Sequence, residues 1–167
     1  MSTLWQEIWE TIQADFSDLP GVTQVTQMTV RLLLAALCGG LLGFERERAG
    51  KEARLRTHML VALGAAFFVV IPQQAGVSPG DMSRVLQGVI TGIGFLGAGT
   101  IIKLSEREEV HGLTTAAGIW LTAAVGIAAG MGREASALLG KALALVVLSL
   151  FPRIVPKTSI AQKNDRE

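Results

Sequence analysis

Long apolar stretches separated by short polar connections make up most of the chain. Five of them have about the 20 residues that a helix needs to cross the roughly 30 Å hydrocarbon core of a bilayer. They cover residues 26–44, 57–76, 83–103, 113–131 and 134–151. The pattern therefore predicts an all-α integral membrane bundle of five transmembrane helices.

The first 25 residues follow a different pattern. Large apolar residues recur there at helical spacing, opposite several acids: Trp5, Ile8, Trp9, Ile12 and Phe16. This pattern is typical of an amphipathic helix lying in the membrane interface, although an acidic, partly disordered tail would also explain it. We divide the chain into an extracytoplasmic or interfacial segment over 1–25, a transmembrane domain over 26–151 and a basic cytoplasmic tail over 152–167.

Basic residues are distributed unevenly among the connections. The connection after the first stretch contains Arg46, Arg48, Lys51, Arg54 and Arg56. More basic residues follow the third stretch and occur in the C-terminal tail, whereas none precedes Arg31. Because cytoplasmic connections carry the excess of Lys and Arg, we predict that the N-terminus is outside and the C-terminus is in the cytoplasm.

Composition excludes several functions. Half of the residues (50%) are hydrophobic, 17% are charged and the net charge is only +1. The charges form short mixed clusters, unlike the concentrated basic face that nucleic acid requires, so we expect no nucleic-acid partner. No nucleophile triad and no metal-ligand spacing occurs, so we expect neither an enzyme nor a cofactor. The expected partners are the lipid bilayer, another membrane protein and further copies of the chain.

The charged connection after the first stretch is the candidate functional site. Its members are Glu45, Arg46, Glu47, Arg56, Thr57 and His58. A carboxylate at the membrane boundary is costly unless it is paired, so we expect Glu45 to pair with Arg46, Arg56 or a neighbouring helix, and we hypothesise that it faces Arg56. We predict that Thr57 caps the second helix. The alternative is a solvated connection that only sets topology.

Three further features concern ionisable residues. His58 and His111 each stand near the start of a predicted helix, where a histidine senses pH or binds an anion, or is simply solvated. Lys141 lies midway along the fifth stretch and is a functional candidate by position. Asp81 and Arg84 are spaced for an ion pair at the start of the third stretch.

Glycines at helical spacing predict where helices contact one another, because small residues let helix backbones approach in lipid. The predicted contact residues are Gly88, Gly92, Gly94, Gly97 and Gly99 in the third stretch, and Gly118 and Gly126 in the fourth.

A weak internal repeat is also present. LRTHMLVALGAA (55–66) aligns with LTTAAGIWLTAA (113–124), and GLLG (40–43) with GFLG (94–97). We hypothesise two parallel helix pairs followed by one additional helix, although chance matches among Ala and Leu are the alternative.

Three sequence blocks resemble a known family. GFERERAGKEARLRTHMLVALGAA (43–66), GIGFLGAGTIIK (92–103) and GLTTAAGIWLTAAVGIAAGMG (112–132) closely resemble the membrane domain of the MgtC/SapB family. The resemblance implies a virulence-associated bacterial protein of the inner membrane, linked to magnesium homeostasis, growth in low magnesium and restraint of the ATP synthase. We expect the short form of the family, with the membrane domain only.

Two functions remain open. One is a non-catalytic regulator that acts on another membrane complex such as the ATP synthase. The other is a transporter of magnesium or another ion. Magnesium sites require carboxylates and retained waters, and the predicted spans offer no carboxylate in their interior, with Glu45 at an edge, which favours the regulator.

Overall fold

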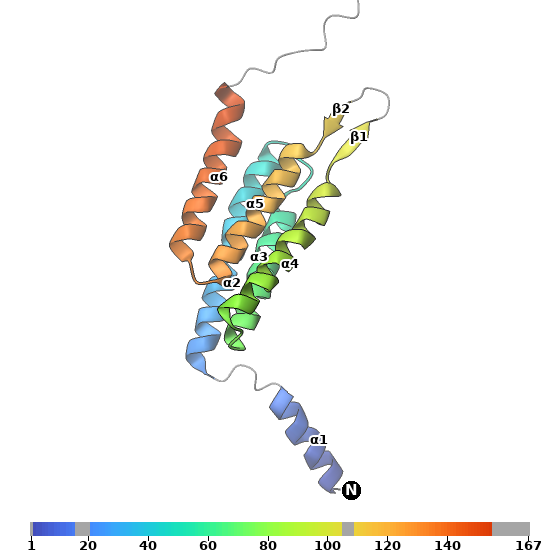
Figure 1. Ribbon diagram of the computed structural model, residues 1–167, viewed down its shortest axis with the longest axis vertical. Coiled ribbons are helices and arrows are strands. Elements are labelled where there is room, and N and C mark those ends of the chain that lie inside the picture. The colour runs from blue at the N-terminus through green and yellow to red at the C-terminus, as the bar shows by residue number, and fades with distance from the viewer. Residues whose placement is uncertain (1, 16–20, 105–108, 155–167) are drawn as a thin grey trace, which may run out of the picture.

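The computed structural model describes residues 2–15, 21–104 and 109–154. Within these residues the chain forms six helices and one short β-hairpin (Figure 1). The elements are α1 (Ser2–Asp15), α2 (Val22–Arg48), α3 (Leu55–Gln74), α4 (Pro79–Ala98), β1 (Ile102–Leu104), β2 (Glu109–His111), α5 (Leu113–Gly130) and α6 (Glu134–Ile154). Phe16 and residues 155–167 of the predicted tail lie outside the described residues.

Helices α2 to α6 form one bundle in which consecutive helices run in opposite directions (Figure 1). Helix α5 lies in its centre and contacts α2, α3, α4 and α6. Helix α1 extends beyond one end of the bundle, and its Trp5 and Trp9 are exposed. The prediction of a helical bundle is thus confirmed, with the hairpin as an addition.

Small side chains fill the space between α2, α3 and α5. One buried cluster contains Ala35, Cys38, Ala62, Ala66, Val125, Ala129 and Ala137. Glycines bring the helix backbones together in the same region, since a Cβ atom added at Gly126 would overlap the carbonyl group of Ala62. Helices in lipid associate through such close backbone contact because no water is excluded between them.

Three helices, α2, α3 and α5, are long and apolar enough to cross a membrane among the described residues. The prediction of five such spans is therefore confirmed for three. The third predicted span is interrupted, because α4 ends at Ala98 and its first half contains Asp81, Arg84 and Gln87. The fifth corresponds to α6, which carries Glu134 and Lys141.

The hairpin replaces the end of the third predicted span. Strands β1 and β2 pair antiparallel, with Ile102 opposite His111. Helix α4 ends in a turn where the N–H group of Thr100 donates to the carbonyl of Gly97. Gly112 then returns the chain to α5 with φ of 90°, and a Cβ atom there would overlap the carbonyl oxygen of Thr100. Only glycine fits this position.

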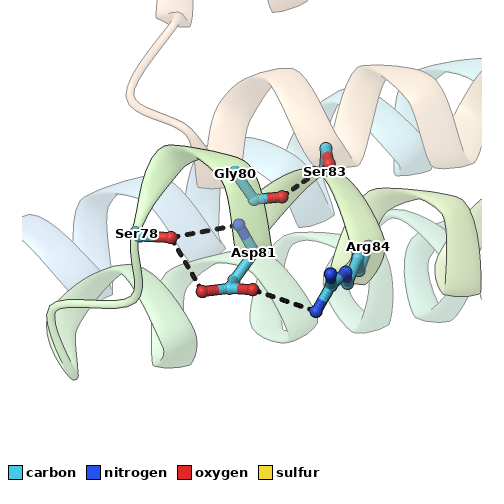
Figure 2. A network of polar contacts seen from close by, with 5 residues as sticks. All are labelled: Ser78, Gly80, Asp81, Ser83 and Arg84. Atoms are coloured by element: carbon cyan, nitrogen blue, oxygen red, sulfur yellow. Dashed lines mark hydrogen bonds and ion pairs between the residues drawn. The ribbon is translucent and has the colours of Figure 1, made fainter.

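The start of α4 is capped by the side chain of Ser78. Figure 2 shows the N–H group of Asp81 donating to Oγ of Ser78 at 3.2 Å, which satisfies one free donor of the first turn. The predicted ion pair between Asp81 and Arg84 is present at 3.3 Å. Both side chains are exposed, so the pair adds little stability.

Candidate functional site

Three of the four buried polar side chains of the described residues lie near one end of the bundle, where α2 ends and α3 and α5 begin, and the fourth, Thr122, lies midway along α5. The four are Arg46, His58, Thr115 and Thr122, with exposed fractions of 3%, 1%, 5% and 0%. We call these four residues together with Glu45 the polar end cluster. Charges on the connection between α2 and α3 predict that this end faces the cytoplasm.

His58 and Thr122 connect α3 to α5. The Thr122 hydroxyl donates to the carbonyl of Gly118 at 2.8 Å, and its oxygen lies 2.7 Å from Nδ1 of His58. Since the single hydroxyl proton is directed to Gly118, Nδ1 of His58 is the donor in the second bond. Nε2 of His58 is buried and has no hydrogen-bond partner among the described residues. The prediction of a solvated His58 is therefore wrong.

Glu45 and Arg46 form the charged part of the cluster. Oε2 of Glu45 lies 3.5 Å from Nη1 of Arg46, and the two side chains are 18% and 3% exposed. Nε and Nη2 of Arg46 have no hydrogen-bond partner within the described residues. Arg46 is close enough to His58 for its charge to act on the imidazole. A buried guanidinium with two free donors is costly.

Arg56 does not take the place proposed for it. Its side chain is exposed, and Glu45 pairs with Arg46 instead. The hypothesis that Glu45 faces Arg56 is therefore wrong. The reason is geometric: Arg46, in the last turn of α2, is buried, whereas Arg56, in the first turn of α3, is exposed.

The start of α3 also differs from the prediction. The helix begins at Leu55, two residues before Thr57, and the residue before it, Arg54, offers no side-chain cap. Instead, Oε2 of Glu47 accepts a hydrogen bond from the N–H group of Leu55 at 3.4 Å. A carboxylate at this position also interacts favourably with the positive end of the helix dipole. Glu47 thus takes the capping role predicted for Thr57.

A polar cavity of about 380 Å³ lies beside the cluster. Its walls are the connection between α2 and α3, including Lys51 and Glu52, and the first residues of α5, including Thr115. The residue before α5 is Gly112, so no side chain caps the helix, and no acid occurs in its first turn. His111 lies at this cavity and is exposed, so its surroundings differ from those of His58.

The predicted contact glycines fall into two groups. A Cβ atom at Gly97, Gly118 or Gly126 would meet α5, His58 or α3, and one at Gly99 would meet the end of α4 itself. By contrast, Gly88, Gly92 and Gly94 have nothing within 4 Å. The first two line an apolar groove of about 610 Å³ between α3 and α4. At these three residues the structure differs from the prediction, because the glycine spacing identifies a smooth face without showing whether a helix covers it.

At the opposite end of the bundle, Arg31 joins three helices. Its Nη1 donates to Oε1 of Gln73 at 2.9 Å and to the carbonyl of Gly130 at 3.3 Å. A cation suits the negative end of α5. The sequence offered one signal, an isolated arginine inside an apolar stretch. Lys141 is half-buried on α6, and no ion pair of its side chain is found in the part of the chain that the structure describes.

The acidic side chains do not gather into a metal site. In residues 2–15, 21–104 and 109–154, no group of three or more His, Cys, Asp or Glu side chains is placed to hold a metal ion. The chemistry that the polar end cluster offers is hydrogen bonding and charge.

A bundle with three helices long and apolar enough to cross a membrane among its described residues indicates a helical membrane protein. Residues 32–156 match the family model described as the MgtC family. The chain therefore belongs to the MgtC family.

Curated relatives agree with this assignment. The chain is 45% identical over 141 residues to Protein SrpB of Synechococcus elongatus, covering 76% of each protein. It is 38% identical over 138 residues to the putative magnesium transporter YhiD of Escherichia coli K12, covering 77% of this chain and 62% of YhiD. It is 45% identical over 123 residues to Protein MgtC of Brucella abortus, covering 72% of this chain and 50% of that protein. No solved structure matches.

Proposed function

We propose that this protein is a non-catalytic regulator in the bacterial inner membrane, which acts on another membrane complex during adaptation to low magnesium. The observation that carries the proposal is the distribution of polarity in the bundle. Three of the four buried polar side chains in the described residues lie near one end and the fourth, Thr122, midway along α5, whereas alanine and glycine fill much of the contact between α2, α3 and α5. A path for a hydrated cation would need polar groups along its length, so this core suits binding better than conduction.

The resemblance names the ATP synthase as one candidate target, and this gives a direct test. Inverted membrane vesicles from cells with and without the protein are compared for ATP-driven proton pumping, measured by quenching of a pH-sensitive dye. If the protein is a regulator of the ATP synthase, proton pumping should be slower in vesicles that contain it than in vesicles that lack it, at equal amounts of ATP synthase. Unchanged pumping, together with unchanged growth in low magnesium, would remove the support for regulation of this target.

The alternative is transport of magnesium or another ion, and the name of the YhiD relative favours it. Reconstitution into liposomes with an internal magnesium dye distinguishes the two functions. Magnesium uptake that is lost in Glu45→Gln, with the protein still inserted and folded, would establish transport and overturn the regulator reading.

We further propose that all five helices α2 to α6 cross the membrane, with the N-terminus outside and the C-terminus in the cytoplasm. The basic connection between α2 and α3 supports this orientation. The hypothesis of two helix pairs gains support from matching glycines: a Cβ atom at Gly43 would meet His58, and one at Gly97 would meet Ala116. Tags at residues 2 and 167, tested for protection from protease in intact cells, check the orientation. Two tags on the same side would contradict an odd number of spans.

A further inference from the structure

We propose that the polar cavity between the α2–α3 connection and the start of α5 binds a phosphate group. This site goes beyond the proposed regulatory function and does not rest on it. The bound phosphate group belongs either to a soluble phosphate or to the headgroup of an anionic lipid, since both present the same oxygens.

The first argument is the uncapped start of α5. The helix has 18 residues, begins after Gly112 without a side-chain cap, and has no acid in its first turn. The N–H groups of a first turn have no partner within the helix, and they carry a partial positive charge that attracts anions. Residues 113–115 line the cavity, so these donors lie at its wall.

The second argument is a buried hydroxyl group at the same wall. Thr115 lines the cavity although it is only 5% exposed. Among the described residues, its hydroxyl group makes no hydrogen bond. The Thr115 oxygen is not among the fully enclosed side-chain atoms without a partner, so it opens onto the cavity, where a phosphate oxygen would accept its proton.

The third argument is the charge around the cavity. Lys51 lines the same cavity as Thr115, and its backbone N–H group donates to the carbonyl of Arg46 at 3.0 Å. This bond anchors the connection to the last turn of α2. Glu52 also lines the cavity and is exposed. Its negative carboxylate would repel a bound anion.

These groups give each substitution a distinct expected sign. Thr115→Val keeps the shape of the side chain and removes the hydroxyl, which should weaken phosphate binding about fivefold. Lys51→Gln removes the charge and should weaken it about tenfold. Glu52→Gln removes a repulsive charge and should strengthen it a few-fold. Arg133→Gln is the matched control, because Arg133 is an exposed cation in the short connection at the opposite end of the bundle.

The experiment uses the full chain in nanodiscs, so that both membrane faces are accessible. In phosphatidylcholine nanodiscs, inorganic phosphate is added and binding is measured by calorimetry and by the shift in thermal unfolding. In a second arm, nanodiscs containing phosphatidic acid replace the soluble phosphate. Thermal unfolding measured without any phosphate checks that each variant folds. If Thr115→Val fails to fold, Lys51→Gln still tests the proposal, because Lys51 is exposed.

Saturable binding of inorganic phosphate that changes as expected in the variants supports a soluble ligand. Stabilisation by phosphatidic acid alone, with the same dependence on Lys51 and Thr115, supports a lipid headgroup. The proposal is overturned if neither source binds, if Lys51→Gln and Thr115→Val bind as wild type, or if Arg133→Gln weakens binding as much as Lys51→Gln does.

Discussion

Replacing Gly126 with alanine places a Cβ atom against the backbone of Ala62. The carbonyl carbon and Cα of Ala62 would each lie 2.9 Å from the new atom, and the carbonyl oxygen closer still. All three are backbone atoms of a neighbouring helix, so no side-chain rotation relieves the overlap and α3 and α5 must separate. Overpacking of this kind costs about 1–3 kcal/mol. The gain of helix propensity from glycine to alanine, about 1 kcal/mol, offsets part of that cost.

Gly92→Ala is the matched control. Gly92 is also a helical glycine, but a Cβ atom there would meet nothing within 4 Å. Only the gain in helix propensity, up to about 1 kcal/mol, then remains. The gain in helix propensity is common to both variants, so the expected difference in the free energy of unfolding between them equals the overpacking cost of about 1–3 kcal/mol, with Gly126→Ala the less stable.

Reversible unfolding in mixed micelles of a mild detergent and dodecyl sulfate measures this difference. Loss of helical circular dichroism gives the midpoint for each variant. Equal stability of the two variants would refute the reasoning, because it would show that α3 and α5 are not in backbone contact at Gly126.

The remaining predictions concern polar residues. Thr122→Val should lower the free energy of unfolding by about 1–3 kcal/mol, because Nδ1 of His58 loses its buried acceptor; equal stability of the variant in the same micelle titration would argue against this bond. Arg46→Met should lower it by about 2 kcal/mol, because the mostly buried Glu45 loses its partner, whereas Arg56→Met should stay within about 0.5 kcal/mol as an exposed substitution. Arg31→Met should lower the free energy of unfolding by about 1–2 kcal/mol through the lost bonds to Gln73 and Gly130. Faster proteolysis at the α3–α4 connection would show that this end of the bundle has loosened.

The positions of the helices followed closely from the sequence. An apolar stretch long enough to cross a membrane has few structures available to it, since every backbone polar group must be satisfied within lipid. The predicted stretch 57–76 became α3 and 113–131 became α5 with shifts of one or two residues. The predicted end of the third stretch was wrong, because apolar residues 101 and 102 extended the pattern past Ala98, where the helix ends.

The site was predictable only where its contacts are local. Glu45 and Arg46 are adjacent in the chain, and their pairing was one of the expected possibilities. Arg31 finds its partners 42 and 99 residues away, and His58 finds Thr122 after 64 residues. No periodicity in one sequence indicates which of two distant helix faces meet, so these bonds required the structure.

The backbone contact at Gly126 and Gly130 has a mechanical consequence. Long side chains between two helices allow small relative movements, because their rotamers can change when one helix slides or turns. Beside Gly126 and Gly130 there is no such layer between α3 and α5, since the carbonyl groups of Ala62 and Ala66 occupy that space. These two helices are therefore expected to move together as one rigid pair. Helix α4 borders the open groove along Gly88 and Gly92. On that face it lacks this constraint and can change its distance from the α3–α5 pair.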